Sequence, residues 1–182
     1  EGDVAVKLSL TGLKGGHSGV DIHLGRANAN KLMFRFLKEA VRDYGARLSS
    51  IDGGSLRNAI PREAVAIITI PGDNVEALWE LVADYQDMFR TEYQGIEESV
   101  LFVAEPAELP ASLIPEEIQD DLINAVTACP NGVYRFIPEL PDVVETSNNL
   151  AIIRSDGSSI TACCLIRSSV ESRKEELASM VE

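Results

Sequence analysis

Apolar residues alternate with other residues in the first segment of the chain, which is the two-residue period of a β-strand. The alternating apolar positions are Val4, Val6, Leu8 and Leu10. Over residues 26–44 the apolar period lengthens to that of a helix, with two adjacent stripes. The stripes consist of Leu32, Phe36 and Ala40 and of Met33, Leu37 and Val41. The chain therefore begins with a predicted strand, a glycine-containing loop and a predicted helix that ends near Gly45.

The same periods predict three more strands and a second helix before residue 106. The strands are predicted over 46–52, 62–70 and 99–105, and the helix over 75–93. Strand 62–70 is apolar on both faces, which is typical of a strand in the interior of a sheet. The element order predicts an α+β fold. Residues 1–105 would form a ferredoxin-like split βαβ unit, with an antiparallel sheet and helices on one face.

The pattern of apolar residues over 106–182 predicts a second, partial βα unit. Its elements are a helix over 115–128, strands over 133–137, 147–155 and 159–168, and a helix over 169–182. Asp156-Gly157 supplies a hairpin turn between the last two strands. The chain ends inside the last helix, and we therefore expect it to be a segment of a longer protein.

Charge and cysteine content narrow the classes of partner. The chain has 16 Lys and Arg against 29 Asp and Glu, a formal net charge of −13. Nucleic acids and anionic membranes need clustered Lys and Arg, so neither is expected as a partner. No apolar run approaches the roughly 20 residues of a membrane helix. Three cysteines without a Cys-x-x-Cys pair indicate reduced thiols, and we expect a cytoplasmic protein.

His17 and His23 are the only histidines, and nothing near them in the sequence completes a metal-ligand set. We therefore expect no metal site within this chain. His17 lies in Gly15-Gly16-His17-Ser18-Gly19, where glycines let the backbone approach a ligand closely. Its imidazole is suited to hydrogen-bond a substrate oxygen or a developing oxyanion. The alternative is a surface turn in which the histidine has no role.

Three more polar residues are candidates for binding. Asn58 precedes a strand and offers both donors and acceptors, for a substrate or for its own turn. Arg167 ends an apolar strand, where a guanidinium can clamp a carboxylate or form a surface ion pair. Asn149 belongs to the polar cluster 145–150, which lines a cleft or caps a strand edge.

Several of these segments, in this order, resemble the aminoacyl-histidine dipeptidases of the M20 metallopeptidase clan. The most specific match joins Gly12-Leu13-Lys14-Gly15-Gly16-His17-Ser18-Gly19 to the following segment 22–32. Asn58-Ala59-Ile60-Pro61 resembles the clan's Asn-x-Ile-Pro element. Segment 145–151 and Arg167-Ser168-Ser169 are similar to later motifs of the same dipeptidases. The matches span nearly the whole chain.

The resemblance implies a lid or dimerisation domain, inserted in a zinc-binding catalytic domain that is absent from this chain. It gives His17 a catalytic role, in which the imidazole polarises the scissile carbonyl and stabilises the oxyanion. In dimeric members this histidine reaches the active site of the partner subunit. Asn58 and Asn149 are then substrate-binding residues, and Arg167 binds the C-terminal carboxylate of the dipeptide.

The resemblance also implies cofactors and partners. Two zinc ions would be held by the missing catalytic domain, so we expect the chain alone to hydrolyse nothing. The expected partners are a dipeptide of the Xaa-His or a related type, the parent's catalytic domain and a second subunit in a homodimer. Two alternatives remain: a non-enzymatic ferredoxin-like dimerisation module, and the lid of another M20 peptidase or deacylase. The sequence leaves open whether His17 acts within its own subunit.

Overall fold

A computed structural model gives the structure, and it describes residues 3–182. Seven strands form one sheet in which every pairing is antiparallel, and a separate pair of short strands lies beside it. The strands are β1 (Asp3–Thr11), β2 (Gly16–His17), β3 (Arg47–Gly53), β4 (Ala59–Ile60), β5 (Ala64–Pro71), β6 (Leu101–Ala107), β7 (Gly132–Ile137), β8 (Leu140–Ser155) and β9 (Ile160–Ser168). The helices are α1 (Ala29–Tyr44), α2 (Val75–Glu92), α3 (Glu116–Ala128) and α4 (Glu171–Val181), with 3-10 turns η1 (Ile22–Leu24) and η2 (Gly72–Asn74).

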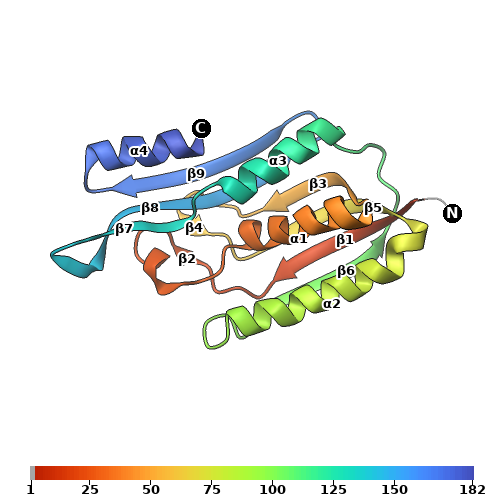
Figure 1. Cartoon of the computed structure of the whole chain (residues 1–182), viewed down its shortest axis with the longest axis horizontal. Helices are drawn as coiled ribbons and strands as arrows, with labels where there is room; N and C mark the ends of the chain where they lie inside the picture. The colour runs from red at the N-terminus through yellow and green to blue at the C-terminus, as the bar shows by residue number, and fades with distance from the viewer. Residues whose placement is uncertain (1–2) are drawn as a thin grey trace.

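The first part of the chain forms the predicted ferredoxin-like arrangement, and the α+β fold is confirmed. Its four long strands lie in the order β6-β1-β5-β3. Strand β5 lies between β1 and β3, as its two apolar faces predict. Helices α1 and α2 connect the strands and lie on the same face of the sheet, together with α3 (Figure 1).

Strand β8 joins the second part of the chain to the same sheet. Its last residues pair with β3 through Asp52↔Arg154 and Gly53↔Ile153. Strand β7 pairs with the first half of β8, and β9 pairs with residues 146–155 of β8. Helix α4 packs along β9 at the edge of the sheet (Figure 1). The segment 106–182 thus extends one continuous sheet.

The hydrophobic core lies between this sheet and the three helices. The inward side chains of β1 and β5 are fully buried. The two predicted stripes of α1 are buried as well, except for Val41, which is partly buried. At one end of the core, four aromatic rings pack with centroid distances between 4.9 and 5.8 Å. These rings belong to Phe36, Tyr85, Phe89 and Phe102. Burial of this apolar surface is the main force that holds the helices to the sheet.

Polar contacts tie α1 to the second part of the chain. Asn28 caps α1, because its Oδ1 accepts hydrogen bonds from the backbone N–H of Asn30 and Lys31. Its Nδ2 donates to the carbonyl of Leu150 at 3.0 Å. The Nζ of Lys31 donates to the last carbonyls of α3, at 2.8 Å from Val126 O. A cation at a helix C-terminus is favourable, so Lys31 fixes α3 over α1.

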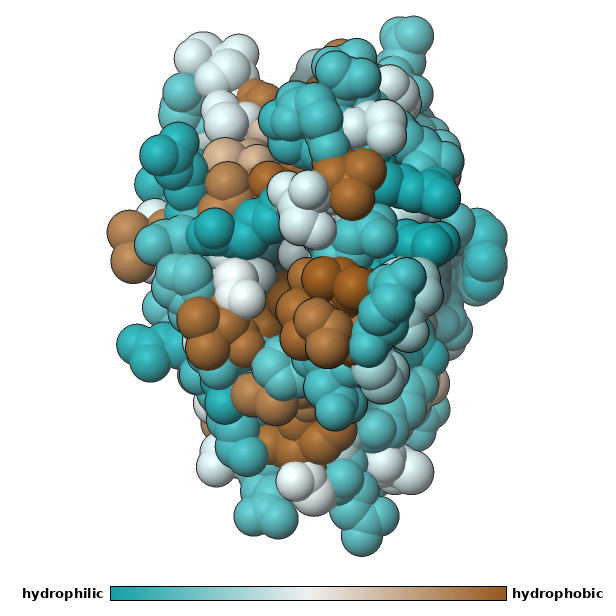
Figure 2. Space-filling model, turned by 90° about the vertical axis from the view of Figure 1, so that its left-hand side faces the viewer, coloured by the Kyte–Doolittle hydropathy of each residue, from teal (hydrophilic) through white to brown (hydrophobic). Residues whose placement is uncertain are grey.

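One end of the molecule exposes apolar side chains. Figure 2 views the end that lies at the left in Figure 1, and apolar residues gather near the middle of that face between hydrophilic ones. The β7–β8 hairpin reaches this end (Figure 1), and four of its large apolar residues are exposed. They are Tyr134, Phe136, Leu140 and Val143. Within residues 3–182, no helix is long and apolar enough to cross a membrane.

Candidate functional site

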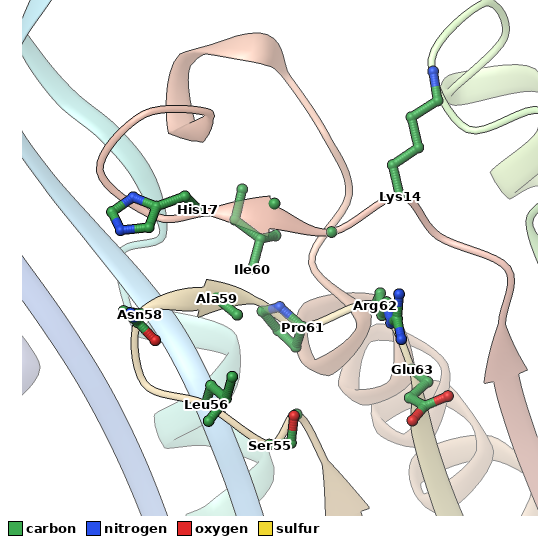
Figure 3. Close-up of a pocket in the computed structure, with 13 residues that line it drawn as sticks. Lys14, His17, Ser55, Leu56, Asn58, Ala59, Ile60, Pro61, Arg62 and Glu63 are labelled. Atoms are coloured by element: carbon green, nitrogen blue, oxygen red, sulfur yellow. The ribbon is translucent and has the colours of Figure 1, made fainter.

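A short two-stranded sheet brings His17 beside the segment that carries Asn58. Strands β2 and β4 pair through Gly16↔Ile60 and His17↔Ala59. The backbone N–H of Ser18 donates to the carbonyl of Asn58 at 2.9 Å. The loop that leads into α1 and the loop between β3 and β5 therefore form one rigid unit (Figure 3). Gly16 has a φ of +133°, a conformation that side chains with a Cβ rarely adopt.

A backbone hydrogen bond orients the His17 imidazole. The N–H of Gly19 donates to His17 Nδ1 at 3.0 Å. A neutral imidazole that accepts at Nδ1 carries its proton on Nε2. The backbone N–H of His17 donates to Asp21 Oδ2 at 2.8 Å, which orients the residue itself. His17 is exposed, so its Nε2–H is available as a donor to a ligand.

Glu97 anchors both ends of the loop that carries His17. Its carboxylate is buried, with 2% of the residue exposed. It accepts a hydrogen bond from Lys14 N at 2.8 Å and another from Ala27 N at 3.0 Å. Sequence reasoning missed Glu97, because it lies 83 residues from Lys14 and 70 from Ala27 and belongs to no motif.

The Arg167 guanidinium lies next to the His17 imidazole, although 150 positions separate them in the numbering. A methyl group placed on Gly19 would lie 3.1 Å from His17 Cε1 and 3.2 Å from Arg167 Cζ. The two side chains therefore flank Gly19. No hydrogen bond or ion pair within residues 3–182 uses the Arg167 side chain, which is exposed. Its charge is available for an anionic ligand.

The Asn149 side chain supports the loop that carries Asn58 through hydrogen bonds to its backbone. Its side chain is buried, with 1% of the residue exposed. Its Nδ2 donates to Ala59 O at 2.8 Å and to Arg57 O at 3.3 Å. Its Oδ1 has no hydrogen-bond partner among the described residues. The structure gives Asn149 a supporting role at the site, while direct contact with a substrate stays a prediction. Asn58 itself is exposed.

A cavity of about 430 Å³ lies beside the β2–β4 pair (Figure 3). Its lining includes His17 and Asn58 but neither Asn149 nor Arg167. The lining residues are Lys14, Gly15, Gly16, His17, Gly54, Ser55, Leu56, Asn58, Ala59, Ile60, Pro61, Arg62 and Glu63. The cavity therefore reaches the His17 imidazole, while the neighbouring Arg167 guanidinium lies outside its lining.

The described residues do not supply a zinc site. Among residues 3–182, no group of three or more His, Cys, Asp or Glu side chains is placed to hold a metal ion. Zinc takes such donors, usually three or four of them. The side chains present here suit hydrogen bonding and anion binding.

Comparisons with known proteins agree on one family. Residues 8–97 match the model of the peptidase dimerisation domain of M20 peptidases. The chain is 39% identical over 176 residues to the cytosol non-specific dipeptidase of Escherichia coli (strain K12), covering 97% of this chain and 36% of that protein. The crystal structure of the aminoacylhistidine dipeptidase from Vibrio alginolyticus superposes with a TM-score of 0.96 at 42% identity. That superposition covers 99% of this chain and 37% of the other. The chain therefore spans little more than a third of the length of either relative.

Proposed function

This chain belongs to the peptidase dimerisation domain family, and on that premise we propose that it is the lid and dimerisation part of a zinc-dependent dipeptidase. The zinc-binding catalytic domain would lie in another part of the protein, and the two zinc ions with it. The coverage of the relative supports this division, because the chain spans 36% of the dipeptidase that it matches.

The observation that carries the proposal is the placement of His17 and Arg167 on the two sides of Gly19. In a dipeptide, the scissile carbonyl belongs to the first residue and the carboxylate to the second, so the two groups are roughly 3.5 Å apart. Donors for the two groups must therefore lie close together. We assign the carbonyl to the Nε2–H of His17 and the carboxylate to the guanidinium of Arg167.

This assignment explains why a dipeptide would be preferred over a longer peptide. A longer substrate has a neutral amide where the dipeptide has a carboxylate, so it would lose the charge-assisted hydrogen bonds to Arg167. His17 would stabilise the negative charge that develops on the carbonyl oxygen during hydrolysis. Asn58, exposed on the neighbouring loop, would orient the substrate, and Asn149 would keep that loop in place.

Kinetics of the complete protein test the two roles separately. We expect His17→Ala to lower kcat by about 10²–10³-fold with little change in KM, because the interaction forms mainly in the transition state. We expect Arg167→Ala to raise KM for a dipeptide and to change little for the corresponding dipeptide amide. His23→Ala is the matched control, since His23 is exposed on the same loop. If His17→Ala kept full activity, the chain would act as an association module only.

We also propose that a second copy of this chain is a partner, through the exposed apolar residues of the β7–β8 hairpin. A surface patch of this kind is typical of an interface. Phe136→Ser and Leu140→Ser together should shift a dimer toward monomer in light scattering coupled to size-exclusion chromatography. Leu109→Ser is the control, because Leu109 is also an exposed apolar residue but lies in the link before α3. An unchanged dimer would place the interface elsewhere.

A further inference from the structure

Two cysteines with no role in the proposed dipeptidase function lie together where α3 meets β9. Cys129 follows α3, and Cys164 lies in the middle of β9. Their sulfur atoms are 3.7 Å apart, although the residues are 35 positions apart in the sequence. Both side chains are half-buried. The separation suits an S–H···S hydrogen bond and exceeds the roughly 2.05 Å of a disulfide, so the pair is reduced.

The surroundings of the pair stabilise a thiolate. The Nζ of Lys31 lies 2.8 Å from the carbonyl oxygen of Cys129, and its positive charge interacts with both thiols. The Nδ2 of Asn148 lies 3.8 Å from Cys129 Sγ and is held by a hydrogen bond of 2.7 Å to Pro130 O. The cation and the amide donor act to lower the pKa of both thiols, so they favour one thiolate within the pair.

Within the pair, the two thiols have different acidities. The hydrogen bond from Cys129 lowers the pKa of Cys164 to about 6, with help from Asn148 and Lys31 and against the effect of burial. The same hydrogen bond raises the pKa of Cys129, which keeps the shared proton. The lowered pKa favours Cys164 as the thiolate of the pair, and the sulfur of Cys129 lies 3.7 Å away, within reach of it.

We propose that Cys164 and Cys129 form a peroxide-reactive dithiol site, in which Cys164 is oxidised first and Cys129 then closes an intramolecular disulfide. A reactive thiolate that is partly exposed and adjacent to a second cysteine is the arrangement of thiols that oxidise reversibly. This inference does not depend on the proposed dipeptidase function.

The reaction balances with hydrogen peroxide as the oxidant. The Cys164 thiolate attacks one peroxide oxygen, so an S–O bond forms, the O–O bond breaks, and hydroxide leaves. The hydroxide takes the proton of Cys129 and becomes water. The Cys129 thiolate then attacks the sulfur of the Cys164 sulfenic acid, so the S–S bond forms and a second hydroxide leaves. The two sulfurs together lose two electrons, and the two peroxide oxygens gain them.

Metal binding fits this pair less well. A third thiol, carboxylate or imidazole does not complete a ligand cluster here among residues 3–182. The Lys31 ammonium beside the sulfurs would also repel a cation. The same positive charge stabilises a thiolate, which is the form of cysteine that reacts with peroxide. The environment therefore favours oxidation of the pair over the binding of a metal ion.

The test is a titration of the purified protein with hydrogen peroxide, followed by thiol counting and peptide mapping without reduction. We expect two of the three thiols to disappear, the mass to fall by two hydrogen atoms, and a peptide that links Cys129 to Cys164. Dithiothreitol should restore all three thiols. Cys163→Ser is the matched control and should behave like the unmodified protein. Three intact thiols after peroxide treatment, or a link that includes Cys163, would overturn the proposal.

Single variants separate the two roles. In Cys129→Ser the second thiol is missing, so Cys164 should accumulate as a sulfenic acid that dimedone traps. In Cys164→Ser no disulfide should form within the chain. If that variant does not fold, alkylation of the unmodified protein decides: iodoacetamide at neutral pH should label Cys164 about 10-fold faster than Cys163. Equal labelling rates, or no dimedone adduct at Cys164 in Cys129→Ser, would contradict the assignment.

Discussion

Gly19 is the residue on which the geometry of the candidate site depends most directly. Its N–H fixes the Nδ1 of His17, and its missing side chain leaves room for two others. Its φ lies outside the left-handed region, so the backbone itself would accept a larger residue. Glycine is therefore required at this position because a larger side chain would not fit between the His17 imidazole and the Arg167 guanidinium.

Gly19→Ala should displace both side chains without unfolding the protein. The added methyl would lie 3.1 Å from His17 Cε1 and 3.2 Å from Arg167 Cζ, so each must move by a few tenths of an ångström. We expect kcat/KM for dipeptides to fall by about 10-fold, because small displacements of catalytic groups are costly. The free energy of unfolding should change by less than about 1 kcal/mol. Unchanged kinetics would mean that His17 and Arg167 do not act together.

Glu97→Gln should loosen the loop that carries His17. The carboxylate accepts from Lys14 N and Ala27 N, while a glutamine has only one acceptor oxygen. One buried N–H is left without a partner, which costs about 1–3 kcal/mol of unfolding free energy. Chemical denaturation measures this loss. Glu98→Gln is the control, since Glu98 is exposed, and equal stabilities of the two variants would contradict the anchoring role.

Sequence reasoning singled out three exposed polar residues of the candidate site and the buried Asn149, but it missed Glu97. His17 stands out because glycines surround it, and Arg167 because it ends an apolar strand. Glu97 has no such context, because its partners are backbone N–H groups far along the chain. The Cys129–Cys164 contact also depends on strand pairing, which local spacing does not reveal. The functional roles of the four predicted site residues remain predictions.

At the scale of elements, the periods of apolar residues predicted the long strands and helices. Strands β2 and β4 were missed, because two residues are too few to show a period. Strand β8 starts at Leu140, whereas the pattern predicted a start at residue 147. Its first residues are exposed on both faces in the hairpin, so they show no alternation of apolar and polar residues.

Asn28→Ala should destabilise the junction between α1 and β8. The change removes the cap of α1 and the 3.0 Å hydrogen bond to the carbonyl of Leu150, which keeps only the longer bond of 3.4 Å from Asn30 Nδ2. We expect a loss of about 1–2 kcal/mol in the free energy of unfolding, measured by urea denaturation. Asn124→Ala in α3 is the control, because Asn124 is exposed and alanine is a good helix former. An equal effect of both changes would argue against the cap.

Acid should loosen the turn between β8 and β9. The Asp156 carboxylate accepts from the backbone N–H of Ser158 at 2.9 Å and of Ser159 at 2.7 Å, and these bonds lower its pKa. The pKa of Asp156 is lower in the folded state than the value of about 3.9 in the unfolded chain, so the carboxylate stabilises the folded turn at pH values above about 3.9. This stabilisation is lost as the pH falls through the pKa of the folded state. NMR titration of the Asp156 carboxyl carbon measures the shift. An ordinary pKa would show that the turn does not depend on this charge.

At the scale of the whole molecule, the two predicted units share one sheet and one core. Residues Ile123 and Val126 of α3 belong to the same buried cluster as Leu8 of β1. The division into 1–105 and 106–182 came from a repeat of element order, and element order does not say which strands pair. Residues 1 and 2 of the predicted first unit lie outside the described structure.

The shared core predicts that the chain unfolds in a single step. Trp79, the only tryptophan, lies in α2 and packs against the core, so its fluorescence reports on the first part of the chain. Far-UV circular dichroism reports on all helices and strands. We expect the two urea transitions to coincide, as they do for one cooperative unit. A separate, earlier transition in circular dichroism would show that residues 106–182 unfold independently.

During synthesis of this protein, β3 cannot pair with β8 until the ribosome has made β8. The ion pair between Asp52 and Arg154 at this junction joins residues 102 positions apart. At about 5–20 residues per second, a ribosome needs roughly 5–20 s to make that intervening chain. Until then β3 has one open edge, and such edges attract other strands. The nascent chain thus passes through a period in which protection by a chaperone would matter most.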